Sequence, residues 1–197
     1  DDLRETRIFS LYRFHDDLSE GRIGNSTARP QVRRFALAKT QKKSGSPAQV
    51  FSLFIEEALL SGNFEKNAGR LPWPVSKGFI SGHYGVQPHP ILKHVTTNNK
   101  GIYIQTPANS TARAVFDGVV TQRFSVPGSN NAVIIQHGEY RTVYANLTDI
   151  YVRIGEKVST KQAVGKIFTD SEKDNKTELY FQIWKNKNLL NPEKWLA

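Results

Sequence analysis

Three of the five histidines in this 197-residue chain fall within one short stretch, SGHYGVQPHPILKH, as His83, His89 and His94. A zinc site needs three or four His, Cys, Asp or Glu side chains that converge on one point, usually with two of them on one helix or strand. The stretch holds two prolines and no periodic pattern, so it predicts a loop without a regular element. We therefore interpret these histidines as ordinary hydrogen-bonding or surface residues, and His137, in QHGEY, as a structural residue at a strand end.

Other catalytic chemistries find little support in the residue types. Cysteine is absent, which excludes disulfides, thiolate ligands and thiol nucleophiles. No GxSxG motif and no phosphate-binding glycine pattern occurs. Glu178 with Asp117, Glu139 or Asp149 would be a carboxylate pair for glycoside hydrolysis, but nothing in the sequence brings two of them together. The residues alone indicate a β domain with no convincing catalytic set.

The composition permits an acidic partner without specifying one. The formal net charge is +9 and the isoelectric point is near 9.8, which suits nucleic acid, anionic lipid or an anionic cell-wall polymer. The basic residues are spread along the chain, so we expect no nucleic-acid partner. No run of eighteen apolar residues and no secretion signal occurs, and the lack of any Met suggests a fragment or a processed form.

The sequence pattern changes near residue 71. Apolar spacing predicts one helix over residues 1–20 and a second over 48–60, ending at Ser61 and Gly62, with a turn-rich and basic linker over 21–47. From residue 71 onward, short β-rich runs alternate with turn signals. We therefore predict a helical arm over 1–70 and a mainly β, antiparallel domain over 71–197, closed by a short helical turn that packs Trp195 and Leu196 onto the body.

One run, NKTELYFQIW from Asn175 to Trp184, alternates strictly. Successive side chains of a strand point to opposite faces, so Leu179, Phe181 and Ile183 are predicted to face the core. Glu178, Tyr180, Gln182 and Trp184 must then share the other face. A carboxylate, a phenol, an amide and an indole in one row suggest a surface with a binding role.

Several motifs in order resemble the LytM, or lysostaphin-like, zinc peptidase family, whose members cleave peptidoglycan cross-links. The matching segments are ISGHYGVQPHP, NKGIYIQTP, ARAVFDGVVTQ, NAVIIQHGEYRTVYANL, VRIGEKVSTKQAVGKI and TELYFQI. The resemblance covers residues 71–197 and implies an antiparallel β-sheet of the sandwich or roll type.

The positions that hold zinc in the family carry other residues in this chain. The motif H-x-G-[IV]-D-[IV] corresponds to NKGIYI, which places Asn99 and Tyr103 at two ligand positions. The motif Y-A-H-L corresponds to YANL, with Asn146 for the functional His, and H-x-H corresponds to ELY, with Glu178 and Tyr180. We therefore expect no metal, no cofactor and no catalysis, since one carboxylate cannot hold Zn²⁺.

The resemblance is closest to EnvC-like murein hydrolase activators. It implies that the former substrate groove binds a periplasmic cell-wall amidase during division, through Asn99, Tyr103, Asn146, Glu178, Tyr180 and Gln182. In that family a helix of an N-terminal arm blocks the groove until a membrane complex of the FtsE–FtsX type moves it. The helix over 48–60 is a candidate for this role, or an ordinary packing helix.

Three alternatives stay open from the sequence. The groove has decayed and binds nothing; the domain binds peptidoglycan strands without an amidase; or it is an active endopeptidase that recruits zinc through His83, His94 and Glu178.

Overall fold

The computed structural model describes residues 47–88, 96–125, 130–172 and 174–197. The chain divides into two compact units, Asp1–Glu56 and Glu57–Ala197, and the second unit contains all of the described strands. The predicted helix over 1–20 and nearly all of the predicted linker lie outside the described residues. No helix among the described segments is long and apolar enough to cross a bilayer.

The second unit consists almost entirely of strands. Its elements begin with the last turns of α2 (Pro47–Lys66). The strands are β1 (Phe79–Gly82), β2 (Gly85–Pro88), β3 (Thr96–Asn99), β4 (Ile102–Thr106), β5 (Thr111–Arg113), β6 (Gly118–Ser125), β7 (Asn131–His137), β8 (Tyr140–Ile150), β9 (Lys157–Val158), β10 (Ala163–Ile167), β11 (Thr169–Asp170), β12 (Lys176–Lys185) and β13 (Asn188–Leu190), followed by the 3-10 helix η3 (Pro192–Lys194).

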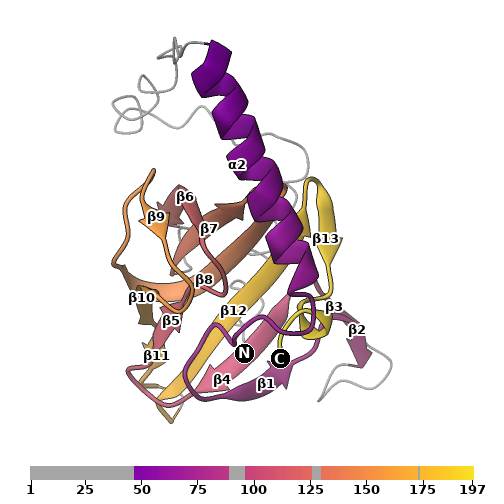
Figure 1. Cartoon of the computed structure of the whole chain (residues 1–197). Coiled ribbons are helices and arrows are strands. Elements are labelled where there is room, and N and C mark those ends of the chain that lie inside the picture. Colours follow the sequence, from indigo (N-terminus) through magenta and orange to yellow (C-terminus); the bar gives the residue numbers. More distant parts are fainter. Residues whose placement is uncertain (1–46, 89–95, 126–129, 173) are drawn as a thin grey trace, which may run out of the picture. The chain divides into compact units, whose positions relative to one another are not determined.

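Eleven of these strands form one sheet in the order β1-β4-β12-β8-β7-β6-β9, with β5, β10, β11 and β13 attached to this row. Every pair of strands is antiparallel, and β2 and β3 form a separate two-stranded sheet. In Figure 1, β12 crosses the middle of the sheet between β4 and β8. The predicted mainly β, antiparallel class is confirmed.

The core lies on one face of this sheet, as the alternation of β12 predicted. Leu179, Phe181 and Ile183 are all fully buried. The ring of Phe181 packs 5.3 Å from that of Tyr144 on β8. Burying each of these side chains contributes about 1.5–3 kcal/mol to folding, so β12 is the central element of the core.

The helix α2 continues past its predicted end. It runs through Ser61 and Gly62 to Lys66, because tertiary contacts offset the helix-breaking tendency of Gly. The ring of Phe64 is fully buried and stacks 4.8 Å from Tyr140, and Ser61 Oγ accepts a 2.6 Å hydrogen bond from Glu139 N.

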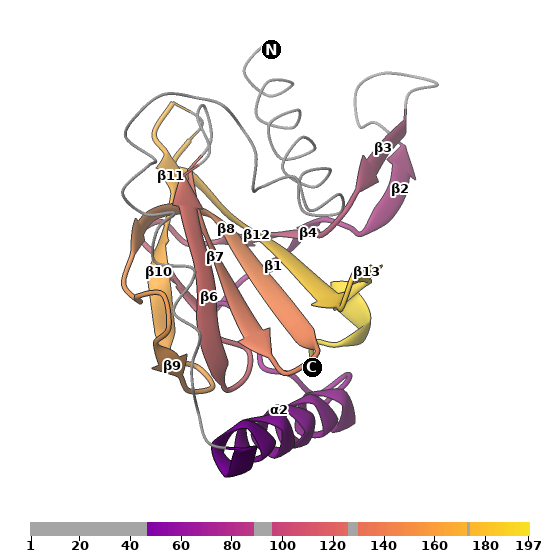
Figure 2. The same cartoon turned by 90° about the horizontal axis from the view of Figure 1, so that it is seen from above.

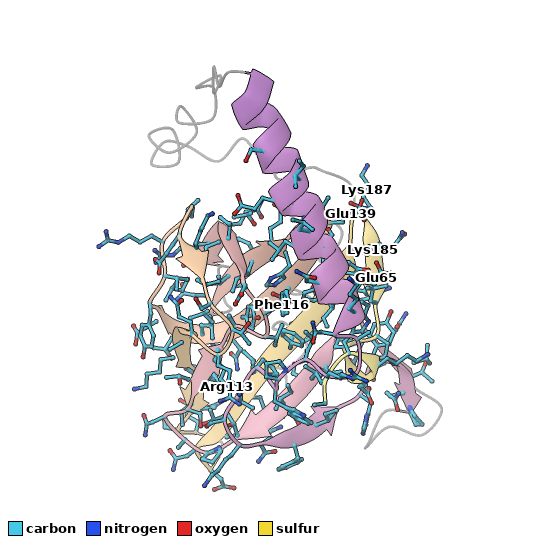
Figure 3. All side chains as sticks on the ribbon, viewed as in Figure 1. Glu65, Arg113, Phe116, Glu139, Lys185 and Lys187 are labelled. Atoms are coloured by element: carbon cyan, nitrogen blue, oxygen red, sulfur yellow. The ribbon has the colours of Figure 1, made fainter. Side chains whose placement is uncertain are left out.

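A charged contact accompanies this helix end. Lys185 Nζ of β12 lies 3.3 Å from Glu65 Oε1, and Figure 3 shows Glu65 beside Lys185 on this side of the domain. Two members of the predicted apolar stripe, Ile55 and Leu59, are exposed. The possible blocking role of this helix stays a prediction.

The stretch predicted as an irregular loop instead holds strands. β1 ends at Gly82, and β2 pairs with β3 in the register Gly85↔Asn99 to Pro88↔Thr96. Pro is tolerated here because it stands at the end of a strand in a two-stranded sheet. His89 and His94 lie outside the described residues. At the C-terminus, the predicted packing of Leu196 is confirmed, since it is 7% exposed.

Candidate partner-binding site

Two of the predicted groove residues, Tyr103 and Tyr180, form a ring pair. They lie directly opposite each other on β4 and β12. Their ring centroids are 4.8 Å apart and the planes are tilted by 44°. Such a pair contributes about 0.5–1.5 kcal/mol beyond the area it buries. Two positions that would bear zinc ligands in the LytM pattern are thus filled by packed aromatic rings.

The backbone of two glycines, Gly82 and Gly101, lies against these rings. A Cβ atom on Gly82 would come within 2.8 Å of the Tyr103 ring. A Cβ atom on Gly101 would come within 2.8 Å of Gln182 Cγ and 3.1 Å of Tyr180 Cζ. Glycine at these two positions permits the close approach that holds the rings in place.

Gln182 belongs to a hydrogen-bonded row along the same face of β12. Its Nε2 donates to the Tyr180 hydroxyl at 2.9 Å, and its Oε1 accepts from Trp184 Nε1 at 3.1 Å. Gln182 is 3% exposed. We expected this row to line a groove, and the structure buries its central amide with both polar atoms bonded, while Tyr103 and Glu178 remain partly exposed.

Glu178 stands at the exposed end of this row. Its Oε1 accepts a 2.8 Å hydrogen bond from Ser81 Oγ and lies 2.8 Å from Lys176 Nζ. The carboxylate is therefore engaged by a hydroxyl and an ammonium group, and its side chain remains 20% exposed. A partly exposed ion pair of this kind suits a polar contact at the rim of an interface.

Asn146 joins β8 to β12 through its side chain. It has a φ of 70° and is the extra residue of a bulge, because Ala132 pairs with Ala145 while Asn131 pairs with Leu147. Asn is one of the few residues that adopts this left-handed conformation readily. Its Nδ2 donates to Glu178 O at 2.6 Å, and its Oδ1 accepts from Asn130 Nδ2 at 2.6 Å. Both polar atoms of the Asn146 amide are therefore hydrogen-bonded within the domain.

Asn99 belongs to a cluster at the start of the β2–β3 pair that sequence reasoning missed. Its Nδ2 donates to His83 O at 2.8 Å. His83 Nδ1 lies 3.0 Å from Glu193 Oε2, and Tyr84 N donates to Glu193 Oε1 at 2.9 Å. Desolvation raises the pKa of the Glu193 carboxyl, but the hydrogen bonds from Tyr84 and His83 outweigh it and lower the pKa overall. No local sequence pattern could have joined residues 110 positions apart.

The donor set does not fit zinc. The amide of Asn99 and the phenols of Tyr103 and Tyr180 are not the imidazole and carboxylate groups that zinc takes in proteins. Of the alternative set, His83 contacts Glu193, Glu178 contacts Lys176, and His94 lies outside the described residues. Within the described ranges, no three His, Cys, Asp or Glu side chains are grouped so that they could hold a metal ion.

His137 is structural, as predicted. It is fully buried at the end of β7, its Nδ1 lies 2.6 Å from Asp117 O, and its Nε2 lies 2.9 Å from Thr142 Oγ1. Burial lowers the pKa of the imidazole to about 4. The Asp117 carboxylate itself accepts from Thr160 N and Oγ1 at 2.6 and 2.8 Å. Asp117 thus serves a turn and does not pair with Glu178 as a glycosidase carboxylate would.

Comparison with known proteins matches this domain to a family and to several relatives. Residues 97–192 match the model of peptidase family M23. The chain is 36% identical over 110 residues to peptidoglycan DD-endopeptidase ShyA of Vibrio cholerae, covering 52% of this chain and 25% of the relative. It is 26% identical over 145 residues to murein hydrolase activator EnvC of Escherichia coli, covering 72% of this chain and 33% of the relative.

Solved structures share the fold. The structure of Helicobacter pylori Csd3 superimposes with a TM-score of 0.54 and 26% identity, covering 66% of this chain and 35% of that one. The chain thus spans a quarter to a third of the length of the two curated relatives. The resemblance to the LytM family and the LytM-type fold predicted from the motifs are both confirmed.

Proposed function

We propose, from the match of residues 97–192 to peptidase family M23, that the chain acts without catalysis, as an activator of N-acetylmuramoyl-L-alanine amidases that remodel peptidoglycan. The observation that carries this proposal is the Tyr103–Tyr180 ring pair, at two positions where the LytM pattern has zinc ligands.

A metal-dependent peptidase needs an ion that lowers the pKa of bound water and polarises the scissile carbonyl. The phenol of tyrosine has an ordinary pKa near 10 and is a poor zinc ligand at neutral pH. Asn99 has an amide where the LytM pattern has an imidazole, and this amide donates to the backbone carbonyl of His83. These residue types support the proposal that the domain does not activate water.

The same residues suit recognition of a protein. Aromatic rings supply contact area at a small cost in side-chain entropy, and they are enriched at the centres of interfaces. Tyr103 and Glu178 are both partly exposed. Ser81 links them, since its Oγ lies 3.3 Å from Tyr103 O and 2.8 Å from Glu178 Oε1, and Glu178 pairs with Lys176. An amidase segment with an apolar side chain flanked by charged ones would match this arrangement.

The relatives support the biological context of the proposal. EnvC is named as a murein hydrolase activator. From the motif resemblance we further propose that this chain acts in the bacterial periplasm during cell division, with autoinhibition by the N-terminal arm and release by a complex of the FtsE–FtsX type. ShyA is named as an endopeptidase of peptidoglycan, which makes the active zinc enzyme the competing function. Binding of peptidoglycan without an amidase is the second alternative.

Binding to an amidase by variants of the site tests the proposal. We expect Glu178→Lys to weaken amidase binding by about tenfold, because it reverses the charge at the rim of the site. Lys187→Glu, an exposed reversal just beyond β12, is the matched control and should leave binding unchanged. If Glu178→Lys binds amidase as tightly as wild type and Lys187→Glu do, the proposed docking site is contradicted. Stoichiometric zinc in the purified protein would favour the endopeptidase.

A further inference from the structure

The β2–β3 pair connects to the main sheet beside the Tyr103–Tyr180 ring pair. β1 ends at Gly82, whose backbone lies against the Tyr103 ring, and the chain then enters β2. On its return, β3 ends at Asn99, and Gly101 lies against the Tyr180 ring before β4 begins. Both ends of the two-stranded sheet are therefore tied to the site.

The β2–β3 pair is a separate sheet from the main one. In the part of the chain that the structure describes, β2 and β3 pair with each other and with no strand of the main sheet. Figures 1 and 2 show them as a separate pair that projects from the end of the domain near β1 and β4. Val86 on β2 is 65% exposed. A two-stranded sheet by itself is at best marginally stable in water.

Two contacts hold the start of this pair: the Tyr84 ring packs against the core, and the carboxylate of Glu193 accepts hydrogen bonds from this segment. The two oxygens of Glu193 accept from Tyr84 N and from His83 Nδ1, at 2.9 and 3.0 Å. Since a carboxylate only accepts hydrogen bonds, His83 Nδ1 must carry a proton. His83 O in turn accepts from the side chain of Asn99, at 2.8 Å, so the same contact reaches the end of β3.

Glu193 itself stands on a rigid base. Its backbone N donates to Asn191 Oδ1, which caps η3. The preceding Pro192 is buried, and Leu196 packs into the core. The carboxylate is thus carried by the body of the domain, so its contacts with His83 and Tyr84 tie the β2–β3 pair to that body.

We propose that Glu193 is a positioning residue that holds the β2–β3 pair as one wall of the partner-binding site beside Tyr103 and Tyr180. This inference rests on the proposed function, since it assigns a wall to the same docking site. Holding the wall in place before binding lowers the ordering cost that the partner must meet. The partner is a protein segment, an amidase surface, that contacts the partly exposed Tyr103 and this wall.

A distance measurement tests the positioning role without any partner. The chain contains no cysteine, so spin labels can be placed at Val86→Cys on β2 and Thr148→Cys on β8, both exposed positions. With Glu193 present, we expect one narrow distribution of label distances by double electron–electron resonance. Glu193→Ala should broaden it, while Lys194→Ala, on the same turn and outside the contact, should not.

Amidase affinity supplies the second arm. We expect Glu193→Ala to weaken binding by about tenfold, Glu193→Gln to weaken it less because one oxygen still accepts from Tyr84 N, and Lys194→Ala to have no effect. Equal distance distributions for wild type and Glu193→Ala would overturn the positioning role. A broadened distribution with unchanged amidase affinity would overturn the assignment of a wall. If the wild type binds no amidase, the proposed function fails, and the distances still decide whether Glu193 positions the pair.

Discussion

His137 makes the stability of the domain depend on pH in a direction that the structure determines. Its imidazole is buried and stacks 4.9 Å from the ring of Phe64. Burial disfavours the charged form and lowers the pKa from 6.5 to about 4. In the unfolded chain the group takes up a proton near pH 6.5, whereas in the folded domain it stays neutral until about pH 4.

The difference between the two pKa values of His137 determines how the free energy of unfolding changes with pH. Below pH 6.5 the unfolded state binds more protons than the folded state, so the free energy of unfolding falls as the pH falls. The loss is about 1.4 kcal/mol per pH unit. Between the two pKa values, 6.5 and about 4, this single residue removes roughly 3 kcal/mol.

Urea unfolding between pH 7 and pH 5 measures the effect. His137→Gln lowers the stability at pH 7 but removes the titrating group. The difference in unfolding free energy between wild type and variant should therefore shrink by about 2 kcal/mol on going from pH 7 to pH 5. A difference that stays constant over this range, or an imidazole NMR signal of His137 that titrates near pH 6.5, would refute the reasoning.

Other substitutions probe the close contacts of the site and the seat of α2. Gly101→Ala should destabilise the domain by about 1–3 kcal/mol, because the new Cβ would collide with Phe181 O. Gly62→Ala in α2 is its matched control, since nothing lies within 4 Å of a Cβ there, and it should stabilise by up to about 1 kcal/mol in chemical unfolding. Phe64→Ala should cost about 3–5 kcal/mol because it empties a fully buried ring site; a loss under about 1 kcal/mol in the same assay would show that α2 is not seated by this ring.

The sequence was most informative where one periodic pattern decided the outcome. The alternation of β12 placed Leu179 and Phe181 in the core, and the structure confirms both. The position of His137 at a strand end was equally readable, because a turn signal follows it directly. These features depend on neighbours along the chain, which a sequence pattern displays.

Features that depend on partners elsewhere in the chain could not be predicted from the sequence. The end of α2 was placed too early because Ser61 contacts the turn between β7 and β8, and Phe64 contacts β7, β8 and the C-terminal segment. The stretch around His83 was predicted to be irregular because residues 89–95 separate β2 from its pairing partner β3, and no alternation within the stretch indicates this pairing. The hydrogen bonds that bury Gln182 and the contact of Glu193 with His83 arise only from side-chain geometry.

Digestion of purified peptidoglycan sacculi tests the central claim most directly. The chain is incubated with sacculi in the presence of zinc, alone and together with a periplasmic amidase of its host, and the released fragments are identified by mass. We predict no release by the chain alone and a marked increase in amidase products when both proteins are present. Peptide cross-links cut by the chain alone, in a zinc-dependent manner, would contradict the account.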